Sequence, residues 1–165
     1  MILMTNRTLS DGPGQQGNYL GLEGSLAEFS KSRVCILPVP LEASTSFGHG
    51  TANGPAALIE ASRNIEGYDV ETDCEVYHIG IHTLPKVTTG SPESILQQVE
   101  ETVFEITSQG KFVVTLGGEH SVSAAPIRVL AQLHGPISVL QFDAHTDLRH
   151  SYEGNPLSHA SVMAR

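Results

Sequence analysis

Acidic and imidazole side chains directly follow an apolar run at two places in the chain. Residues 141–149 read QFDAHTDLR, in which Asp143, His145 and Asp147 alternate after the apolar run ISVLQF. The other place is GGEHS, residues 117–121, which follows the run FVVTL and includes His120. Because buried charge has to be paired or has to bind a cation, these side chains predict a metal site.

The ligand types narrow the choice of ion. Two carboxylates and two imidazoles suit Mn, Fe, Ni or Zn better than Cu(I) or an iron–sulfur cluster. A carboxylate between such ligands can bridge two ions about 3.5–4 Å apart, as in two-metal hydrolases. A lone Asp-x-His is more often a surface turn, and the glycines of GGEHS can serve only a tight turn with Glu119 at the start of a helix. The two motifs together favour the metal site.

For three further polar residues, a role in the site has to be weighed against a purely structural one. His49, in FGHGTANG, either approaches the rim of the site or makes a loop hydrogen bond. His150 follows the metal motif and either faces a substrate or lies in solvent. Ser121 has neither an elbow motif nor a base partner, which argues against a serine nucleophile.

The elements that position these residues alternate between strands and helices. Apolar runs predict strands, and helical periodicity with Ser91 as N-cap and Gly110 as a stop predicts the longest helix. Such alternation is typical of an α/β protein with a mainly parallel sheet, whose ligands bind at the carboxyl ends of the strands. The predicted strands are 33–40, 75–81, 111–116 and 136–142, and the predicted helices are 55–64, 91–110 and 123–134.

A direct geometric expectation follows from this pattern. If strands 111–116 and 136–142 are neighbours, their ends bring the two polar motifs together. Residues two apart in an extended segment point to the same side, so Asp143, His145 and Asp147 are expected to line one face of the crevice.

Composition bounds the class of protein. The chain has 165 residues, 18 acidic against 9 basic, and a formal charge of −9, which argues against a nucleic-acid or anionic-membrane surface and is compatible with a cationic substrate. The sequence has neither a membrane-length apolar run nor a convincing signal peptide, and its two cysteines are no disulfide framework. We therefore expect a cytoplasmic protein, with 1–32 as a peripheral arm that can be flexible and 33–165 as the domain.

The motifs GGEHS and DAHTDLR together resemble those of the ureohydrolase family, the arginases and agmatinases. The resemblance runs from about Val34 to Arg165, and PVPLEASTSFGHGTANGPAALIEAS and SHASVMAR are similar to the agmatinase branch. It implies a three-layer α/β/α fold and a homo-oligomer with a binuclear manganese centre. It also implies that activated water attacks the guanidinium carbon, which releases urea and an amine, putrescine if the substrate is agmatine.

The resemblance also assigns residues. By position, His120, Asp143 and Asp147 would ligate one manganese, Asp143 would bridge, and His145 would ligate the second. His159 falls where the family often has a histidine near the guanidino group, as a proton shuttle to the leaving amine. Glu119 stands where many members have Asp, and it is not expected to be a ligand.

The family pattern is longer than this sequence. Members continue for about as long again, with a later Asp-x-Asp pair and an acidic residue that holds the guanidinium. The sequence is therefore expected to be the N-terminal portion of the domain, without its C-terminal strands and with an open sheet edge. The substrate stays open among agmatine, guanidinobutyrate, arginine and formiminoglutamate. The alternatives are a truncated non-catalytic module that binds metal weakly or joins full-length subunits, and a different two-metal hydrolase.

Overall fold

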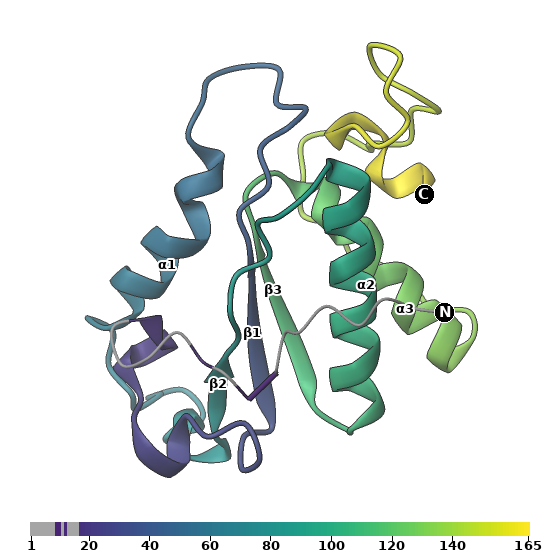
Figure 1. The fold of residues 1–165 in the computed structure, drawn as a ribbon. Coiled ribbons are helices and arrows are strands. Elements are labelled where there is room, and N and C mark those ends of the chain that lie inside the picture. The colour runs from purple at the N-terminus through teal and green to yellow at the C-terminus, as the bar shows by residue number, and fades with distance from the viewer. Residues whose placement is uncertain (1–8, 11, 13–16) are drawn as a thin grey trace.

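The computed structural model describes residues 9, 10, 12 and 17–165. At its centre lies a parallel sheet of three strands in the order β2-β1-β3 (Figure 1). Val34 is the first paired residue of the central strand, and it pairs with Ile81 on one side and Phe112 on the other. The strands are β1 Val34–Val39, β2 Ile81–Thr83 and β3 Phe112–Gly117.

Helices cover both faces of the sheet. Helix α1 lies on one face, and α2 and α3 pack against each other on the opposite face (Figure 1). This is the expected three-layer α/β/α arrangement. The α-helices are α1 Gly54–Ser62, α2 Pro92–Ser108 and α3 Ala124–His134. The short 3-10 helices are η2 Tyr19–Gly21, η3 Gly24–Leu26, η4 Thr51–Asn53, η5 Val76–Ile79, η6 His120–Ser123 and η7 His159–Ala164.

The main core lies between β1 and the helix pair α2–α3. Alternate residues of a strand face opposite sides of a sheet, and β1 places every second side chain in this core. The apolar stripe of helix α2, which the sequence predicted, packs in the same core. The strand contributes Cys35, Leu37 and Val39, and the helix contributes Ile95, Leu96, Val99, Val103 and Ile106.

Most predicted elements are confirmed to within a few residues, because their local signals agree with their burial. The Ser91 hydroxyl caps α2 and accepts from the Ser94 backbone N–H at 3.3 Å, with Pro92 at the first helical position. Pro126 lies in the first turn of α3, where it removes no intrahelical hydrogen bond.

The predicted strand 75–81 is wrong for most of its length. Its central residues form η5, and β2 begins only at Ile81. The Glu75 side chain accepts from the Tyr77 hydroxyl at 2.8 Å and lies 3.2 Å from the His78 imidazole, so local contacts favour a turn here. His78 is exposed.

The predicted strand 136–142 is also wrong. This segment has an extended apolar sequence but no strand beside it, and β3 pairs with β1 alone in the described residues. Leu140 is 81% exposed and Phe142 is 91% exposed. The segment therefore does not pair with β3. Among the described residues, the edge of β3 that faces away from β1 has no strand beside it.

The predicted arm 1–32 lies partly outside the described residues, which omit 1–8, 11 and 13–16. The part that is described is attached to the domain. Phe29 packs against the core, and the Lys111 ammonium donates to the Phe29 and Ser32 carbonyls at 2.8 and 2.6 Å. None of the described helices has the length and apolar character needed to span a bilayer.

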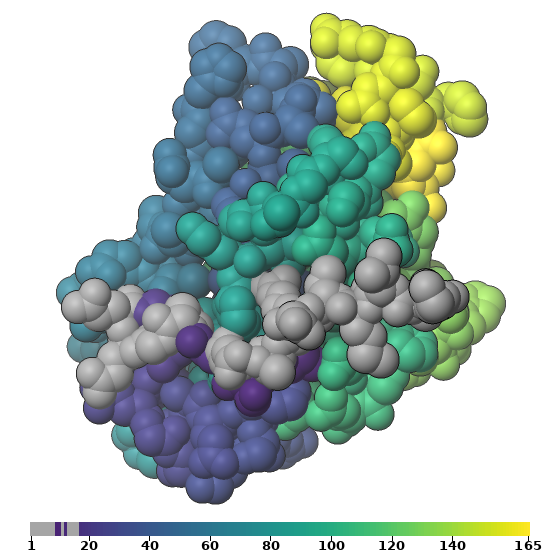
Figure 2. Space-filling view, in the orientation of Figure 1, coloured from purple at the N-terminus to yellow at the C-terminus, as the bar shows by residue number. Residues whose placement is uncertain are grey.

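The loop after β1 and the C-terminal segment stand at the same end of the molecule (Figure 2). This is the end at which β1 and β3 have their carboxyl termini (Figure 1). The predicted site residues should therefore be sought here, as they are in other α/β sheets.

Candidate metal centre

The turn after β3 begins the site. The Glu119 backbone N–H donates to the Leu41 carbonyl at 2.8 Å, so this turn crosses closely over the chain that leaves β1. A Cβ atom on Gly118 would lie 2.2 Å from the same carbonyl oxygen, and only glycine fits there. The crossing fixes the start of η6 and hence the position of His120.

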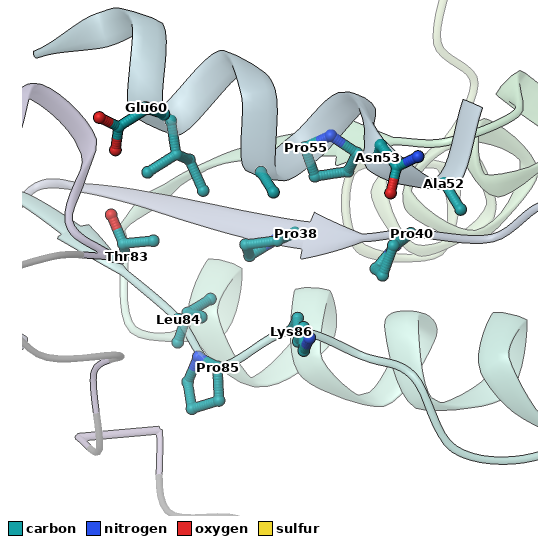
Figure 3. Close-up of a pocket in the computed structure, with 13 residues that line it drawn as sticks. Pro38, Pro40, Ala52, Asn53, Pro55, Glu60, Thr83, Leu84, Pro85 and Lys86 are labelled. Carbon is teal, nitrogen blue, oxygen red and sulfur yellow. The ribbon is translucent and has the colours of Figure 1, made fainter. Parts of the chain in front are cut away.

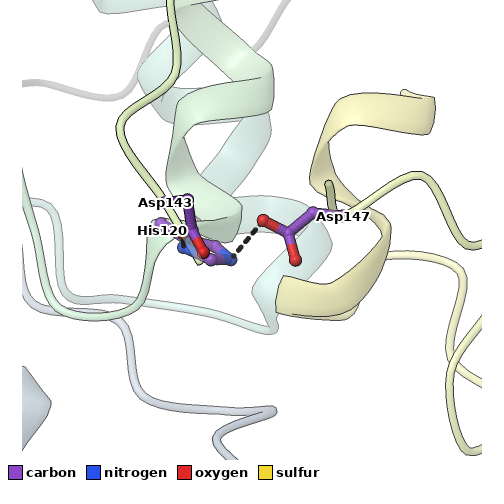
Figure 4. Close-up of side chains that lie close together, drawn as sticks. All are labelled: His120, Asp143 and Asp147. Carbon is purple, nitrogen blue, oxygen red and sulfur yellow. Dashed lines mark ion pairs between the residues drawn. The ribbon is translucent and has the colours of Figure 1, made fainter. Parts of the chain in front are cut away.

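Three predicted ligands meet at this point (Figure 4). Ligand atoms of His120, Asp143 and Asp147 all lie within 4.8 Å of one another. His120 Nδ1 is 3.4 Å from Asp143 Oδ2, and His120 Nε2 is 3.7 Å from Asp147 Oδ2. We call this group the His120 cluster.

Asp147 is the buried acid of the cluster. Its side chain is 5% exposed, and its backbone has a φ of +48°, a left-handed conformation that aspartate tolerates better than most residues. In the described part of the chain, one hydrogen-bond donor reaches its carboxylate, the Gln141 amide at 2.8 Å from Oδ2. A buried carboxylate with so little compensation favours a cation beside it.

Asp143 is held by a local turn. The His145 backbone N–H donates to Asp143 Oδ1 at 2.8 Å and is the main cause that lowers the pKa of this carboxyl below its ordinary value. The imidazoles of His120 and His145 act in the same direction. Asp143 is therefore an anion near neutral pH.

His145 lies outside the cluster. Its side chain is 81% exposed, although its Nδ1 is 3.5 Å from Asp143 Oδ1. The expectation that Asp143, His145 and Asp147 line one face is wrong, because the segment bends into a turn and is not an extended strand. The two oxygens of Asp143 consequently face two different histidines, His120 and His145.

His159 stands beside the cluster, at the start of η7. The centres of its ring and the His120 ring are 6.0 Å apart, and the Tyr152 ring stands edge-on at 5.7 Å. The His159 carbonyl lies 2.9 Å from His120 Nε2. The structure therefore brings four of the five predicted site residues together, with the fifth, His145, at the edge.

The chemistry of the cluster fits a divalent cation. A carbonyl oxygen only accepts, so the contact with His159 makes Nε2 the protonated nitrogen of a neutral His120 and leaves the Nδ1 lone pair facing Asp143. A ligating histidine commonly donates its other N–H to a carbonyl in this way. One imidazole and two carboxylates suit Mn²⁺ among other divalent ions.

Sequence reasoning missed the residues that support the cluster. Ser44 bonds both Glu119 and His159, and Gln141 holds Asp147. Burial raises the pKa of Glu119, but hydrogen bonds from Ser121, Ser44 and Ala43 outweigh it and lower the pKa overall. Ser44 lies in a polar loop and Gln141 ends an apolar run, so no pattern in the sequence separates them from ordinary surface residues.

The other polar candidates lie elsewhere or serve structure. His49 is exposed and its ring is 3.3 Å from Glu42 Oε1, and His150 is exposed. The Ser121 hydroxyl donates to Glu119 at 2.6 Å, in line with the expectation that it is no nucleophile.

A separate hollow of about 650 Å³ lies on the α1 face of the sheet (Figure 3). Prolines from several elements line it, with Glu60 and Lys86 as its charged residues. It holds none of the predicted ligands, so we place the candidate chemistry at the His120 cluster.

Known proteins are similar to this chain in sequence and in fold. A sequence model of the arginase family matches residues 32–165. The N(1)-aminopropylagmatine ureohydrolase of Synechocystis is 32% identical over 149 residues, which are 86% of this chain and 49% of that protein. The agmatinase of Bacillus anthracis is 35% identical over 139 residues, which are 83% of this chain and 48% of that protein.

Solved structures show the same fold. The agmatine ureohydrolase of Thermoplasma volcanium has a TM-score of 0.76 at 27% identity, over 84% of this chain and 46% of that one. A Trypanosoma cruzi formiminoglutamase solved with Mn²⁺ has a TM-score of 0.77 at 18% identity, over 93% of this chain and 52% of that one. This chain spans about half the length of the relatives that it matches. The chain belongs to the arginase family.

Proposed function

We propose that this protein is a manganese-dependent hydrolase of a guanidino compound, which converts agmatine to putrescine and urea. The observation that carries the proposal is the His120 cluster with His159 beside it, at the carboxyl end of the sheet in a chain of the arginase family. Ureohydrolase and agmatinase relatives support the class of reaction.

In this proposal His120, Asp143 and Asp147 would hold one manganese, and Asp143 together with His145 would hold a second. The contacts of the two Asp143 oxygens with two different histidines support a bridging role. Bound manganese would supply Lewis-acid activation of water at neutral pH. Gln141 and the His159 carbonyl keep the Asp147 carboxylate and the His120 ring in position.

His159 would carry the proton in this reaction. A neutral imidazole can accept a proton near neutral pH and then donate it to the leaving amine. The protonated amine is the better leaving group. The acidic balance of the chain, with a formal charge of −9, favours the approach of a cationic guanidinium.

Agmatine is the substrate that we favour, and N(1)-aminopropylagmatine is its main competitor, since both names occur among the relatives. The two compounds share the guanidino end that would meet the His120 cluster and differ at the opposite amine end. Guanidinobutyrate, arginine and formiminoglutamate complete the set to be compared.

The test is urea release by the protein in its natively expressed form, loaded with Mn²⁺ and offered each of these compounds. We expect urea release from agmatine and loss of that release in Asp143→Ala. We expect no loss in Asp73→Asn, which changes an exposed acid that is distant in sequence from the His120 cluster. No urea from any of the compounds, or full release by Asp143→Ala, would refute the proposal. The first of these results would favour the non-catalytic module instead.

We also propose a cytoplasmic location and a homo-oligomeric state. Cys35 and Cys74 are both free thiols, which fits a reducing compartment. Sedimentation of the natively expressed protein tests the oligomeric state, and a monomer at all concentrations would contradict it.

A further inference from the structure

Glu119 is a buried acid with a complete set of hydrogen-bond donors. Its residue is 5% exposed. One oxygen, Oε2, accepts from the backbone N–H groups of Ala43 at 2.8 Å and Ser44 at 2.7 Å. The other, Oε1, accepts from the hydroxyls of Ser44 at 2.8 Å and Ser121 at 2.6 Å. The carboxylate is fully used in these contacts, and it turns towards the loop after β1.

The Ser44 hydroxyl connects this carboxylate to His159. A serine hydroxyl has one proton to donate and two lone pairs that accept. The proton goes to Glu119, because an ionised carboxylate can only accept. Both lone pairs then face His159, whose backbone N–H lies 2.9 Å from Ser44 Oγ and whose Nδ1 lies 3.2 Å from it.

This proton count fixes the form of the imidazole. Since Ser44 has no proton left to offer, Nδ1 must bring its own hydrogen to the contact. A neutral His159 is then protonated at Nδ1, and its basic lone pair is at Nε2. Among the described residues, none is within hydrogen-bonding distance of Nε2, so this nitrogen is free to exchange a proton.

We propose that Glu119 is a positioning residue that acts through Ser44 to hold His159 in the Nδ1–H tautomer. This inference rests on the proposed function and adds to it the group that prepares the proton carrier. His159 accepts a proton at Nε2 and returns the same proton from Nε2 to the leaving amine, while Nδ1 keeps its own proton in the hydrogen bond that it donates to Ser44 Oγ. Such an acid orients an imidazole without touching the substrate.

A second hydroxyl near His159 Nδ1 could favour the opposite tautomer. The buried Ser158 hydroxyl lies 3.4 Å from His159 Nδ1 and would donate to it if Nδ1 carried no proton. In that case the tautomer would be Nε2–H, and Glu119 would serve only the loop. The shorter contact with Ser44, and the hold of Glu119 on the Ser44 proton, favour Nδ1–H.

Glu119→Gln should reverse the tautomer without changing the shape of the side chain. The amide oxygen takes the place of Oε2, since it must accept from two backbone N–H groups, and the amide nitrogen takes the place of Oε1. That nitrogen donates to Ser44 Oγ and so releases the Ser44 proton towards His159 Nδ1. The neutral ring then becomes Nε2–H.

The experiment is nitrogen NMR of the metal-free chain with ¹⁵N-labelled histidine, at about pH 8, where neutral imidazole predominates. We expect Nδ1–H for His159 in the unmodified chain and Nε2–H in Glu119→Gln. Ser44→Ala is a second variant and should give Nε2–H as well, because Ser158 then donates to Nδ1. Ser121→Ala is the matched control, since it removes a donor to the same Glu119 oxygen but keeps the contact with Ser44, and it should remain Nδ1–H.

Nε2–H in the unmodified chain, or an unchanged tautomer in both Glu119→Gln and Ser44→Ala, would overturn the inference. This measurement needs no catalysis, so failure of the tautomer prediction can be distinguished from failure of the proposed function, which would appear as an absence of urea release. If the protein does release urea, Glu119→Gln should lower kcat at least about tenfold with little change in KM, because it alters a proton-transfer step and not a substrate contact.

Discussion

At position 147 an aspartate adopts a left-handed backbone conformation and buries its charge beside His120. Both features are unfavourable for folding, and such features persist where the surroundings enforce them, often at functional sites. The Gln141 amide and the His120 ring are the polar side chains that meet this carboxylate. The proposed metal centre therefore depends on few contacts, each of which can be removed by a single substitution.

Gln141→Ala should weaken Mn²⁺ binding by about 10–100-fold, the usual effect of losing a residue that orients a ligand. The Asp147 carboxylate would lose the donor at 2.8 Å that holds it towards His120. Titration of the chain with Mn²⁺ and detection of the free ion measures the change. Gln97→Ala, on the exposed side of α2, is the control, and equal affinities for the two variants would contradict the role of Gln141.

The two cysteines should differ sharply in reactivity. Cys35 is fully buried in β1, and burial raises the pKa of its thiol to about 11, whereas Cys74 is exposed. Because the thiolate is the reactive form, one thiol per folded chain should react with a disulfide reagent at pH 8, and both should react after unfolding. Loss of the fast reaction in Cys74→Ser identifies the site; rapid reaction of two thiols in the folded chain would contradict the burial of Cys35.

At the scale of elements, the site is built where two connections cross. The segment after β1 and the turn after β3 touch backbone to backbone, and this crossing places Glu119, Ser44 and His120 together. The segment that carries Asp143 and Asp147 then folds over the start of η6. The site therefore depends on turn geometry more than on the strands themselves.

Gly118→Ala tests this crossing. The added Cβ would lie 2.2 Å from the Leu41 carbonyl oxygen, so the two connections must separate. We expect a loss of stability of several kcal/mol, about the size of other severe steric changes, and a loss of Mn²⁺ binding. Gly54→Ala is the matched control, since its Cβ would lie 3.5 Å from the nearest atom in an ordinary helical conformation. Similar thermal melts for the two variants would refute the crossing.

Elements with strong local signals could be predicted from the sequence. The cap at Ser91 and the apolar stripe of α2 determine that helix locally, and the proline-closed run determines β1. Residues 136–142 have an equally strong strand sequence, but a strand also needs a partner, and a partner is a property of the tertiary structure. The segment 75–81 fails for the opposite reason, because contacts of Glu75 favour a local turn.

The site was predictable in part for the same reason. His120, Asp143 and Asp147 belong to recognisable motifs, and the structure brings them together. The position of His145 was not predictable, because it follows from a turn in a segment that reads as extended. Ser44 and Gln141 act through contacts between distant segments, which a single sequence does not display.

At the scale of the whole molecule, stability comes from one core between β1 and the helix pair α2–α3. Apolar residues of 137–142 contribute little to it, because they are largely exposed. The chain therefore contains two kinds of apolar run, one that holds the fold together and one that lies on its surface. The sequence does not distinguish them.

Leu37→Ala and Leu140→Ala should separate these two kinds. Leu37 is fully buried in the central strand, and its truncation should cost about 2–5 kcal/mol of unfolding free energy. Leu140 is exposed, and its truncation should change stability by less than about 0.5 kcal/mol. Urea denaturation measures both, and equal losses would contradict the placement of the core.

Electron paramagnetic resonance of Mn²⁺ added to this chain would show whether the His120 cluster binds a metal ion. Asp147→Asn and Asp73→Asn form a matched pair, because both aspartates have left-handed backbones, with φ of +48° and +53°, that asparagine also tolerates. We predict saturable Mn²⁺ binding by the unmodified chain and by Asp73→Asn, and affinity at least about tenfold weaker for Asp147→Asn. Equal binding by all three folded chains would contradict the account.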